Sequence, residues 1–232
     1  GNITGTITTK TGAIVFGGTN SNVYKLDEMV NICAVVDLGG NDRYFEGTLS
    51  ENRPVLIIID LSGNDVYLGT RPGIQGGALL GISALIDCAG DDTYEANDLA
   101  QGSCLGGVGI LIDMTGNDSY KGKRRVQGQA ISGVGLLLDC GGSDKYRGAL
   151  LAQGVGGPLG FGLLADIGGN DHYYAGGLYP CPYDDSPGHG GFSQGVGIGP
   201  RGVANGGIGM LLDGWGDDVY EADYFSTAGA YW

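Results

Sequence analysis

Apolar residues occupy alternate positions in short segments that recur along the chain. The segment VGILIDM, residues 108–114, shows the pattern, since its even-numbered and odd-numbered residues would lie on opposite sides of an extended strand. The same columns continue in the segments LLLDC and LIIIDLS. We assign to the core the even-numbered set, which consists of Val108, Ile110, Ile112 and Met114. The alternation predicts β-strands whose apolar side chains stack in ladders.

A longer period organises these strands into units. The phrase DLSGNDVY at residues 60–67 belongs to a set of related phrases, whose first aspartates fall at positions 37, 60, 87, 113, 139, 166 and 213. Gln-Gly pairs that begin at positions 75, 101, 127 and 153 are each 26 residues apart. A fixed period of this length without helical periodicity is typical of a solenoid. We therefore predict an all-β fold, a right-handed parallel β-helix of about eight coils with a period near 26 residues.

The units are expected to form one domain over residues 1–232. Residues 1–24 would form a degenerate N-terminal strand and coil, in which Asn22 and Tyr24 stand where later units have the second aspartate and the tyrosine. Residues 25–173 would form the regular coils, residues 174–212 a coil with an inserted loop, and residues 213–232 a last, incomplete coil.

The core assignment leaves a second aliphatic column on the outside of the coils. Its members are Val35, Ile58, Leu85, Leu111, Leu137, Leu164 and Leu211. A continuous apolar row in contact with water favours a partner, a second chain or a covering segment. Alternatively, the solenoid is flattened, and both apolar sets are partly buried.

Each unit carries two aspartates five positions apart, followed by a tyrosine. The residue between the second aspartate and the tyrosine varies freely, which indicates that it faces solvent and that the tyrosines stack inward as an aromatic ladder. Equivalent carboxylates on stacked coils would lie about 4.8 Å apart and repel one another by about 1 kcal/mol per pair even in water. Backbone N–H groups of the turn could cap them, or calcium could bind between coils, because that ion prefers oxygen ligands. Both could operate together.

The segments LSGNDVYLG, TGNDSYKG and GGNDRYFEG resemble the nonapeptide of the RTX calcium-binding β-roll, a glycine-rich turn that ends in Gly-x-Asp, then x, then a large inward apolar residue. In that family the aspartate and the turn carbonyls bind calcium between coils. The resemblance covers about a third of the chain and implies calcium ligands at Asp42, Asp65, Asp92, Asp118, Asp144, Asp171 and Asp218. The first aspartates of the units complete the candidate metal-ligand set: Asp37, Asp60, Asp87, Asp113, Asp139, Asp166 and Asp213.

Charge and cysteine content narrow the range of functions. The chain has 26 acidic and 12 basic residues, and the resulting net charge of −14 argues against nucleic-acid binding and points towards cations. Five cysteines are an odd number, which excludes a full disulfide framework. Cys88 and Cys140 directly follow first aspartates, where other units carry large apolar residues, and we expect both in the core. No run of 18 apolar residues occurs, so no membrane span is predicted.

One Gly- and Pro-rich stretch interrupts the repeat between residues 173 and 213. The loop at residues 179–193 contains a catalytic-looking cluster, Asp184, Asp185 and His189. Two carboxylates and a histidine could supply an acid, a base and a proton relay for glycoside hydrolysis. The simpler interpretation is an exposed loop whose acids are solvated or bind a surface ion.

These observations favour a non-catalytic, calcium-stabilised repeat protein, secreted or at the cell surface, with a structural or adhesive role. Open ends of a solenoid favour self-association end to end or further repeats. Extracellular calcium is abundant enough to fill weak sites, which is the reason for the expected location. The alternative is a β-helix that binds or cleaves a polysaccharide at the 179–193 loop. A third possibility is a repeat module of a larger protein whose function resides elsewhere.

Overall fold

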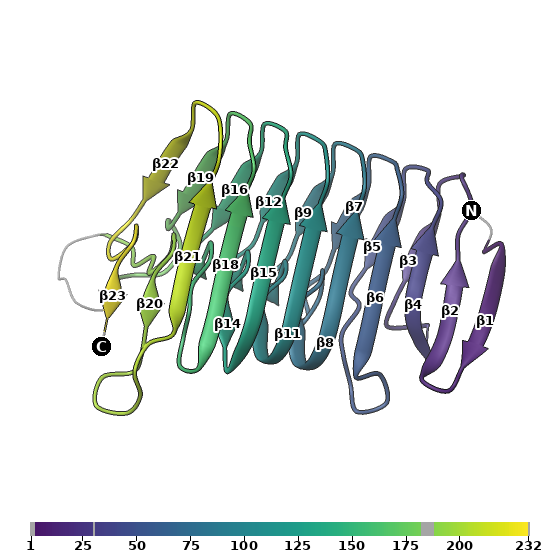
Figure 1. The fold of residues 1–232 in the computed structure, drawn as a ribbon, viewed down its shortest axis with the longest axis horizontal. Helices are drawn as coiled ribbons and strands as arrows, with labels where there is room; N and C mark the ends of the chain where they lie inside the picture. The colour runs from purple at the N-terminus through teal and green to yellow at the C-terminus, as the bar shows by residue number, and fades with distance from the viewer. Residues whose placement is uncertain (1–2, 30, 182–187, 232) are drawn as a thin grey trace.

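The computed structural model describes residues 3–29, 31–181 and 188–231. In these ranges the chain forms strands, turns and irregular segments and no helix, so it also contains no helix long and apolar enough to cross a membrane. The strands wind into a parallel β-solenoid, whose coils stack side by side from the N-terminal to the C-terminal end (Figure 1). The predicted fold class is confirmed.

One face of the solenoid is a ten-stranded sheet, called here the long sheet. Its strands are β1 (Gly5–Thr9), β2 (Gly12–Phe16), β4 (Ile32–Asp37), β6 (Val55–Asp60), β8 (Ala78–Asp87), β11 (Cys104–Asp113), β14 (Ala130–Ile131), β15 (Gly133–Asp139), β18 (Gly160–Asp166) and β21 (Ile208–Asp213). Strand β1 pairs antiparallel with β2, while the other strand pairs are parallel.

A second sheet of eight parallel strands, called here the tyrosine sheet, faces the long sheet. Its strands are β3 (Val23–Lys25), β5 (Arg43–Phe45), β7 (Val66–Leu68), β9 (Thr93–Glu95), β12 (Ser119–Lys121), β16 (Lys145–Gly148), β19 (His172–Ala175) and β22 (Val219–Ala222). A third side consists of β10 (Asp98–Ala100), β13 (Arg124–Val126) and β17 (Leu150–Ala152). Strands β20 (Gly197–Ile198) and β23 (Ala230–Tyr231) pair near the C-terminal end.

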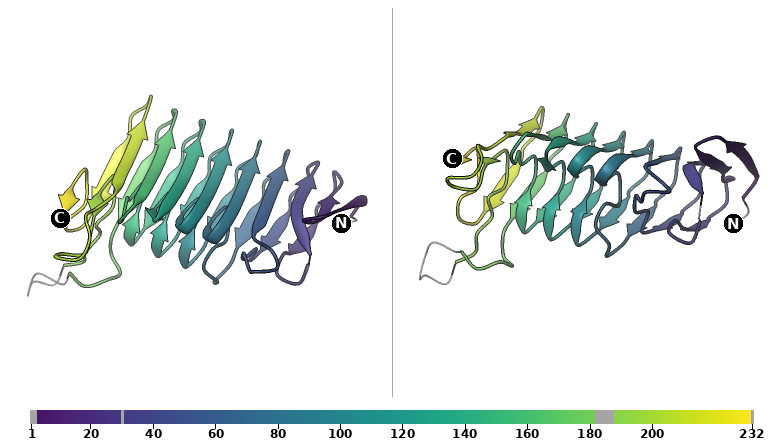
Figure 2. Two further views of the ribbon diagram at one scale, coloured as in Figure 1. Left: turned by 60° about the horizontal axis from the view of Figure 1, so that its bottom comes forward. Right: turned by 90° about the horizontal axis from the view of Figure 1, so that it is seen from below.

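The register of the long sheet places each first aspartate opposite the first aspartate of the next unit. Asp60 pairs with Asp87, Asp87 with Asp113, and Asp166 with Asp213 across an insertion. About five turns keep the period near 26 residues, fewer than the eight coils expected. The unit that begins at Asp37 is shorter than this period, and the unit that begins at Asp166 is longer. Figure 2 shows that the strands of successive coils lie side by side along the length of the solenoid.

The core lies between the two large sheets, and the assignment of inside and outside in the sequence analysis was wrong. Leu111 is fully buried, whereas Ile110 and Ile112 are half-buried and Met114 is exposed. The column expected outside is therefore the core column of the long sheet. It contains Val35, Ile58, Leu85, Leu111, Leu137 and Leu164, all buried, and the half-buried Leu211 of the last coil. Cys88 and Cys140, which were expected in the core, are half-exposed and lie outside the core column.

The error has a physical cause. Both sides of each long-sheet strand are apolar, so alternation separates two faces without showing which one is buried. The first aspartate shares its side with the leucine, and an aspartate is expected in water unless it finds partners. In this protein it finds them inside, as described below.

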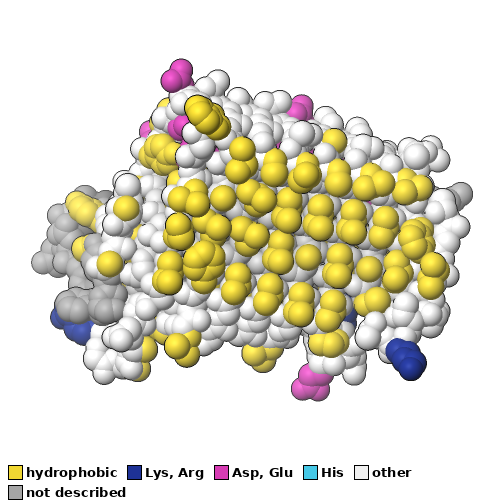
Figure 3. All heavy atoms as spheres, viewed as in Figure 1, with side chains coloured by type: hydrophobic (Ala, Val, Ile, Leu, Met, Phe, Trp, Pro, Cys, Tyr) yellow, Lys and Arg dark blue, Asp and Glu magenta, His cyan; other side chains and the backbone are white. Residues whose placement is uncertain are grey.

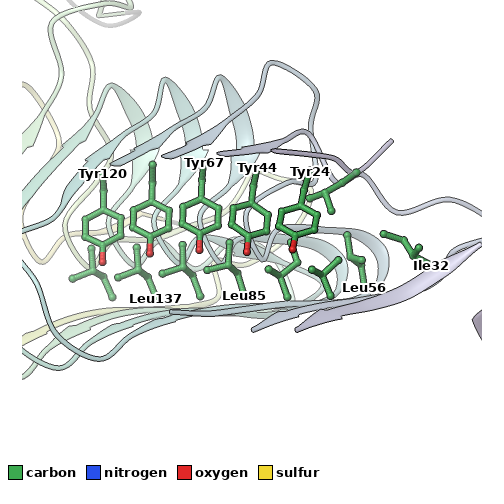
Figure 4. Close-up of a cluster of buried hydrophobic side chains, with 14 of the residues drawn as sticks. Tyr24, Ile32, Tyr44, Leu56, Tyr67, Leu85, Tyr120 and Leu137 are labelled. Carbon is green, nitrogen blue, oxygen red and sulfur yellow. The ribbon is translucent and has the colours of Figure 1, made fainter. Parts of the chain in front are cut away.

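The inward tyrosine ladder is confirmed. Successive rings from Tyr24 to Tyr220 stack with centroids 4.7 to 4.9 Å apart and interplanar angles of 15° or less. Figure 4 shows the rings side by side, with their hydroxyl groups pointing towards the leucine column of the long sheet. Tyrosine and leucine columns thus form one continuous core cluster along the solenoid.

Candidate metal site in two aspartate columns

Two columns of aspartates follow the solenoid where the long sheet turns towards the tyrosine sheet. The first-aspartate column ends the long-sheet strands, and the second-aspartate column precedes the tyrosine-sheet strands by one residue. Twelve of the fourteen candidate ligands are buried: Asp37, Asp42, Asp60, Asp65, Asp87, Asp92, Asp113, Asp118, Asp139, Asp144, Asp166 and Asp171. Asp213 and Asp218 are half-buried, because they belong to the last coil.

The first-aspartate column is held by tyrosine hydroxyls. Tyr94 Oη donates to Asp113 Oδ2 over 2.7 Å, and Tyr120 Oη donates to Asp139 Oδ2 over the same distance. Equivalent bonds join Tyr44 to Asp60, Tyr67 to Asp87 and Tyr146 to Asp166. In most coils the other oxygen, Oδ1, accepts a backbone N–H two residues further along, as Asp139 does from Gly141 over 3.0 Å. Each such carboxylate is therefore tied both to its own turn and to the preceding coil.

The second-aspartate column is held by backbone N–H groups. The N–H of Asp92 donates to Asp118 Oδ1 in the next coil over 2.6 Å, and the N–H of Asp118 donates to Asp144 Oδ1 in the same way. The series runs from Asn22 to Asp218 with N···O distances of 2.5 to 2.9 Å. Capping by turn amides, one of the two compensations considered from the sequence, therefore operates in this column.

The second oxygen of these carboxylates is left without a partner. Oδ2 is buried and forms no hydrogen bond in Asp42, Asp65, Asp92, Asp118, Asp144 and Asp171. A buried acceptor without a partner costs about 1–3 kcal/mol, and more when it is charged. Amide capping thus satisfies one half of each carboxylate in this column.

Carboxylate oxygens from both columns converge between coils. Asp92, Asp113 and Asp118 each offer one oxygen, and these oxygens lie within 4.8 Å of one another. The same arrangement recurs further along, in the group of Asp118, Asp139 and Asp144 and in that of Asp144, Asp166 and Asp171. A first aspartate therefore lies between two consecutive second aspartates, and such all-oxygen groups could hold a metal ion.

The environment strongly disfavours a bare negative charge on the second aspartates. Burial, followed by repulsion from Asp87, raises the pKa of Asp92 to about 10. Burial and repulsion from Asp113 raise the pKa of Asp118 to about 9. The pKa of Asp113 rises to about 7, mainly through burial, and the hydrogen bond from Tyr94 opposes that rise. A proton or a bound cation on these carboxylates would remove the cost of the buried charge.

No side-chain cation supplies that compensation among the described residues. Their salt bridges with aspartate involve Asp27, Asp98 and Asp223, which lie outside both columns. The first unit compensates in another way, because Asn22 occupies the second-aspartate position and its Nδ2 donates to Asp37 Oδ2 over 2.9 Å. A neutral side chain with a donor thus replaces the charged one at this end.

The Gln-Gly marker of the repeat has a structural role that the sequence did not reveal. The side chain of Gln127 is buried, and its Nε2 donates to the backbone oxygens of Tyr120 and Arg147 in consecutive coils. Gln101 and Gln153 make the equivalent pair of bonds. The sequence did contain a signal for this role. The Gln-Gly pair repeats without change, whereas positions that face solvent in this chain vary.

The cluster expected in the inserted loop is only partly within the described residues. Asp184 and Asp185 lie outside them. His189 is partly exposed, and its Nδ1 lies 3.6 Å from Asp223 Oδ2, a residue of the last coil that the sequence did not associate with it. A catalytic role for this loop stays a prediction.

No protein-family model, curated protein or solved structure matches this chain. The stacked coils and buried aspartate groups are observed in the fold, while the RTX resemblance gains no support from a family match.

Proposed function

We propose that the protein is a non-catalytic structural repeat protein of the cell exterior that binds calcium between its coils. The observation that carries this proposal is the row of buried, unpartnered Oδ2 atoms in the second-aspartate column, each next to a first aspartate. The ligand set consists of carboxylate oxygens, with neither thiolate nor imidazole, which suits a hard cation such as calcium.

Calcium would act as a staple between coils. An ion that binds carboxylates from two successive coils neutralises their repulsion and stabilises the folded state by an amount that grows with the logarithm of the calcium concentration divided by Kd. The unfolded chain holds these aspartates far apart, so binding and folding are coupled. A location outside the cell follows from the calcium supply there, and a structural or adhesive role follows from the uniform, repetitive scaffold.

Thermal unfolding with and without calcium tests the proposal. We expect the metal-free protein to gain several degrees in Tm on addition of calcium, because several sites bind only the folded chain. The double variant Asp92→Asn/Asp118→Asn should lose roughly half of this gain, because these two residues belong to about half of the aspartate groups between coils, and it keeps the Oδ1 acceptors while removing two charges. Asp91→Asn is the matched control, because Asp91 is exposed in the same turn. Equal Tm values with calcium and with chelator would contradict the proposal.

End-to-end association is a second part of the proposal. Among the described residues, the last ring of the tyrosine ladder is that of Tyr220, which is 45% exposed although its equivalents in preceding coils are buried. A coil stacked on that face would cover the ring and extend both sheets. We expect linear chains of protein in electron micrographs of concentrated samples, and Tyr220→Lys should shorten them.

A further inference from the structure

The outer surface of the long sheet is a flat apolar face. In β6, β8, β11, β15, β18 and β21, the outward positions are the residue after the first aspartate and those one, three and five before it. These 24 positions, called here the apolar face, carry apolar side chains except at Gly214. Figure 3 shows them as parallel rows that cover most of this side of the molecule.

The apolar face carries no charge, and its side chains are half-buried or exposed except that of Ala165, which is 8% exposed. Ile82, Met114 and Val134 are 47%, 44% and 41% exposed. The outer side of the tyrosine sheet differs, because its outward positions include charged and exposed residues such as Arg43, Lys121 and Lys145. One outer side of the solenoid is therefore polar and charged, and the other is apolar. A soluble protein rarely exposes so large a continuous apolar patch without a partner.

The dimensions of the apolar face match those of a stable interface. Six strands about 4.8 Å apart and seven residues of about 3.3 Å each give a projected area of about 650 Å². Two such faces in contact would bury about 1,300 Å², which lies within the range of specific protein interfaces, roughly 1,200–2,000 Å².

We propose that a second copy of this chain docks on the apolar face, so that the two long sheets pack against each other about a twofold axis. Aligned sheets pack about 10 Å apart through interdigitated apolar rows, and the in-register rows of this face offer ridges and grooves that complement themselves. The absence of charge removes the like-charge contacts that a net charge of −14 per copy would otherwise bring together.

A second copy fits this face better than a lipid surface. Faces that bind anionic membranes combine apolar residues with a surrounding set of lysines and arginines. The turns at one edge of the apolar face carry exposed acids instead, among them Asp91 and Asp217. Twofold contact through the face also closes the assembly at two copies, which separates it from the open chains expected from end-to-end contact.

Light scattering and sedimentation between about 1 and 100 µM test this proposal. We expect twice the 23.7 kDa chain mass for the wild type. The variant Ile82→Lys/Met114→Lys/Val134→Lys should dissociate at least about 100-fold more readily, because three charges would be buried in the interface. Its control is Val23→Lys/Val203→Lys/Val219→Lys, which adds the same charge at exposed positions elsewhere and should leave the dimer intact.

Three outcomes would overturn the proposal: a wild-type monomer throughout this range, a dimer that the face variant leaves unchanged, or a monomer that floats with neutral phosphatidylcholine vesicles. Circular dichroism and a thermal melt verify the fold of each variant. If the triple variant fails to fold, the single Met114→Lys variant replaces it, since Met114 lies just beyond a strand end and is already exposed.

Discussion

The hydroxyl group of Tyr94 donates a hydrogen bond of 2.7 Å to Oδ2 of Asp113 in the next coil. Both residues are fully buried, and the same pairing recurs from coil to coil. The hydroxyl makes a buried carboxylate tolerable where no side-chain cation is available. It also links the tyrosine sheet to the long sheet through the interior, in addition to the stacking of the rings.

Removal of this hydroxyl should therefore destabilise the protein although the aromatic stack is kept. We expect Tyr94→Phe to lower the free energy of unfolding by about 1–3 kcal/mol, because Asp113 Oδ2 loses its donor in a buried place. Tyr224→Phe is the control, since Tyr224 is exposed at the C-terminal end. Urea unfolding measures both, and equal midpoints for Tyr94→Phe and wild type would contradict this account.

The adjacent residues Leu136 and Leu137 provide a direct test of inside and outside. Leu137 is fully buried in the core column, and Leu136 belongs to the apolar face. Leu137→Ala should cost about 2–5 kcal/mol of unfolding free energy through lost burial and a cavity, whereas Leu136→Ala in the monomer should cost about 1 kcal/mol or less. Urea unfolding at the lowest practical protein concentration separates this effect from any on association. The reverse order would restore the original core assignment.

How far the sequence could lead is clear from particular residues. The register of Asp87 with Asp113 and the stacking of Tyr94 on Tyr120 follow from the repeat, because any solenoid aligns equivalent positions. The burial of Asp113 did not follow, since it depends on a hydroxyl that reaches it across the interior. The closeness of His189 to Asp223 depends on the path of an irregular insertion, which no repeat specifies.

One overlooked signal marks the interior of the coils. Gly109, Gly135, Gly162 and Gly209 occupy the position four residues before the first aspartate, on the same side as the leucine column. A Cβ atom at Gly135 would lie 2.3 Å from the backbone oxygen of Gln129. Two backbone segments of the same coil therefore lie very close together on this side, and only glycine, which has no Cβ atom, fits between them. In this chain the glycine column lies on one side of the strands only, whereas aliphatic residues lie on both, so the glycines mark the interior.

This close approach predicts an effect of a single methyl group. Gly135→Ala should destabilise the protein by about 1–3 kcal/mol, because the clash is with backbone that cannot move without disturbing the coil. Gly5→Ala is the control, since nothing lies within 4 Å of its added Cβ. Differential scanning calorimetry of both variants measures the difference, and an unchanged Tm for Gly135→Ala would contradict the packing described here.

The aspartate columns predict an unusual pH dependence of stability. An aspartate in the unfolded chain has a pKa of about 3.9, whereas burial together with neighbouring carboxylates raises the folded-state pKa of Asp65 and Asp144 to about 8 and that of Asp92 to about 10. Between these limits the folded chain binds more protons than the unfolded chain. Without metal, the contribution of these aspartates to stability is therefore complete below about pH 4 and is lost as the pH rises towards their folded-state pKa values, by up to about 1.4 kcal/mol per pH unit for each excess proton.

Calcium should oppose that fall, because it replaces the protons and meets less competition from them as the pH rises. Melts between pH 5 and 9 should therefore show a Tm that decreases steeply in chelator and less steeply in calcium, so that the two curves diverge with pH. Asp92→Asn/Asp118→Asn should flatten the chelator curve, since two of the groups that titrate are gone, while Asp91→Asn should leave it unchanged. A Tm in chelator that rises from pH 5 to pH 9 would show that the second aspartates are ionised in the folded protein without any cation, and the proton account of the column would fail. Two curves that coincide at every pH would contradict the calcium account.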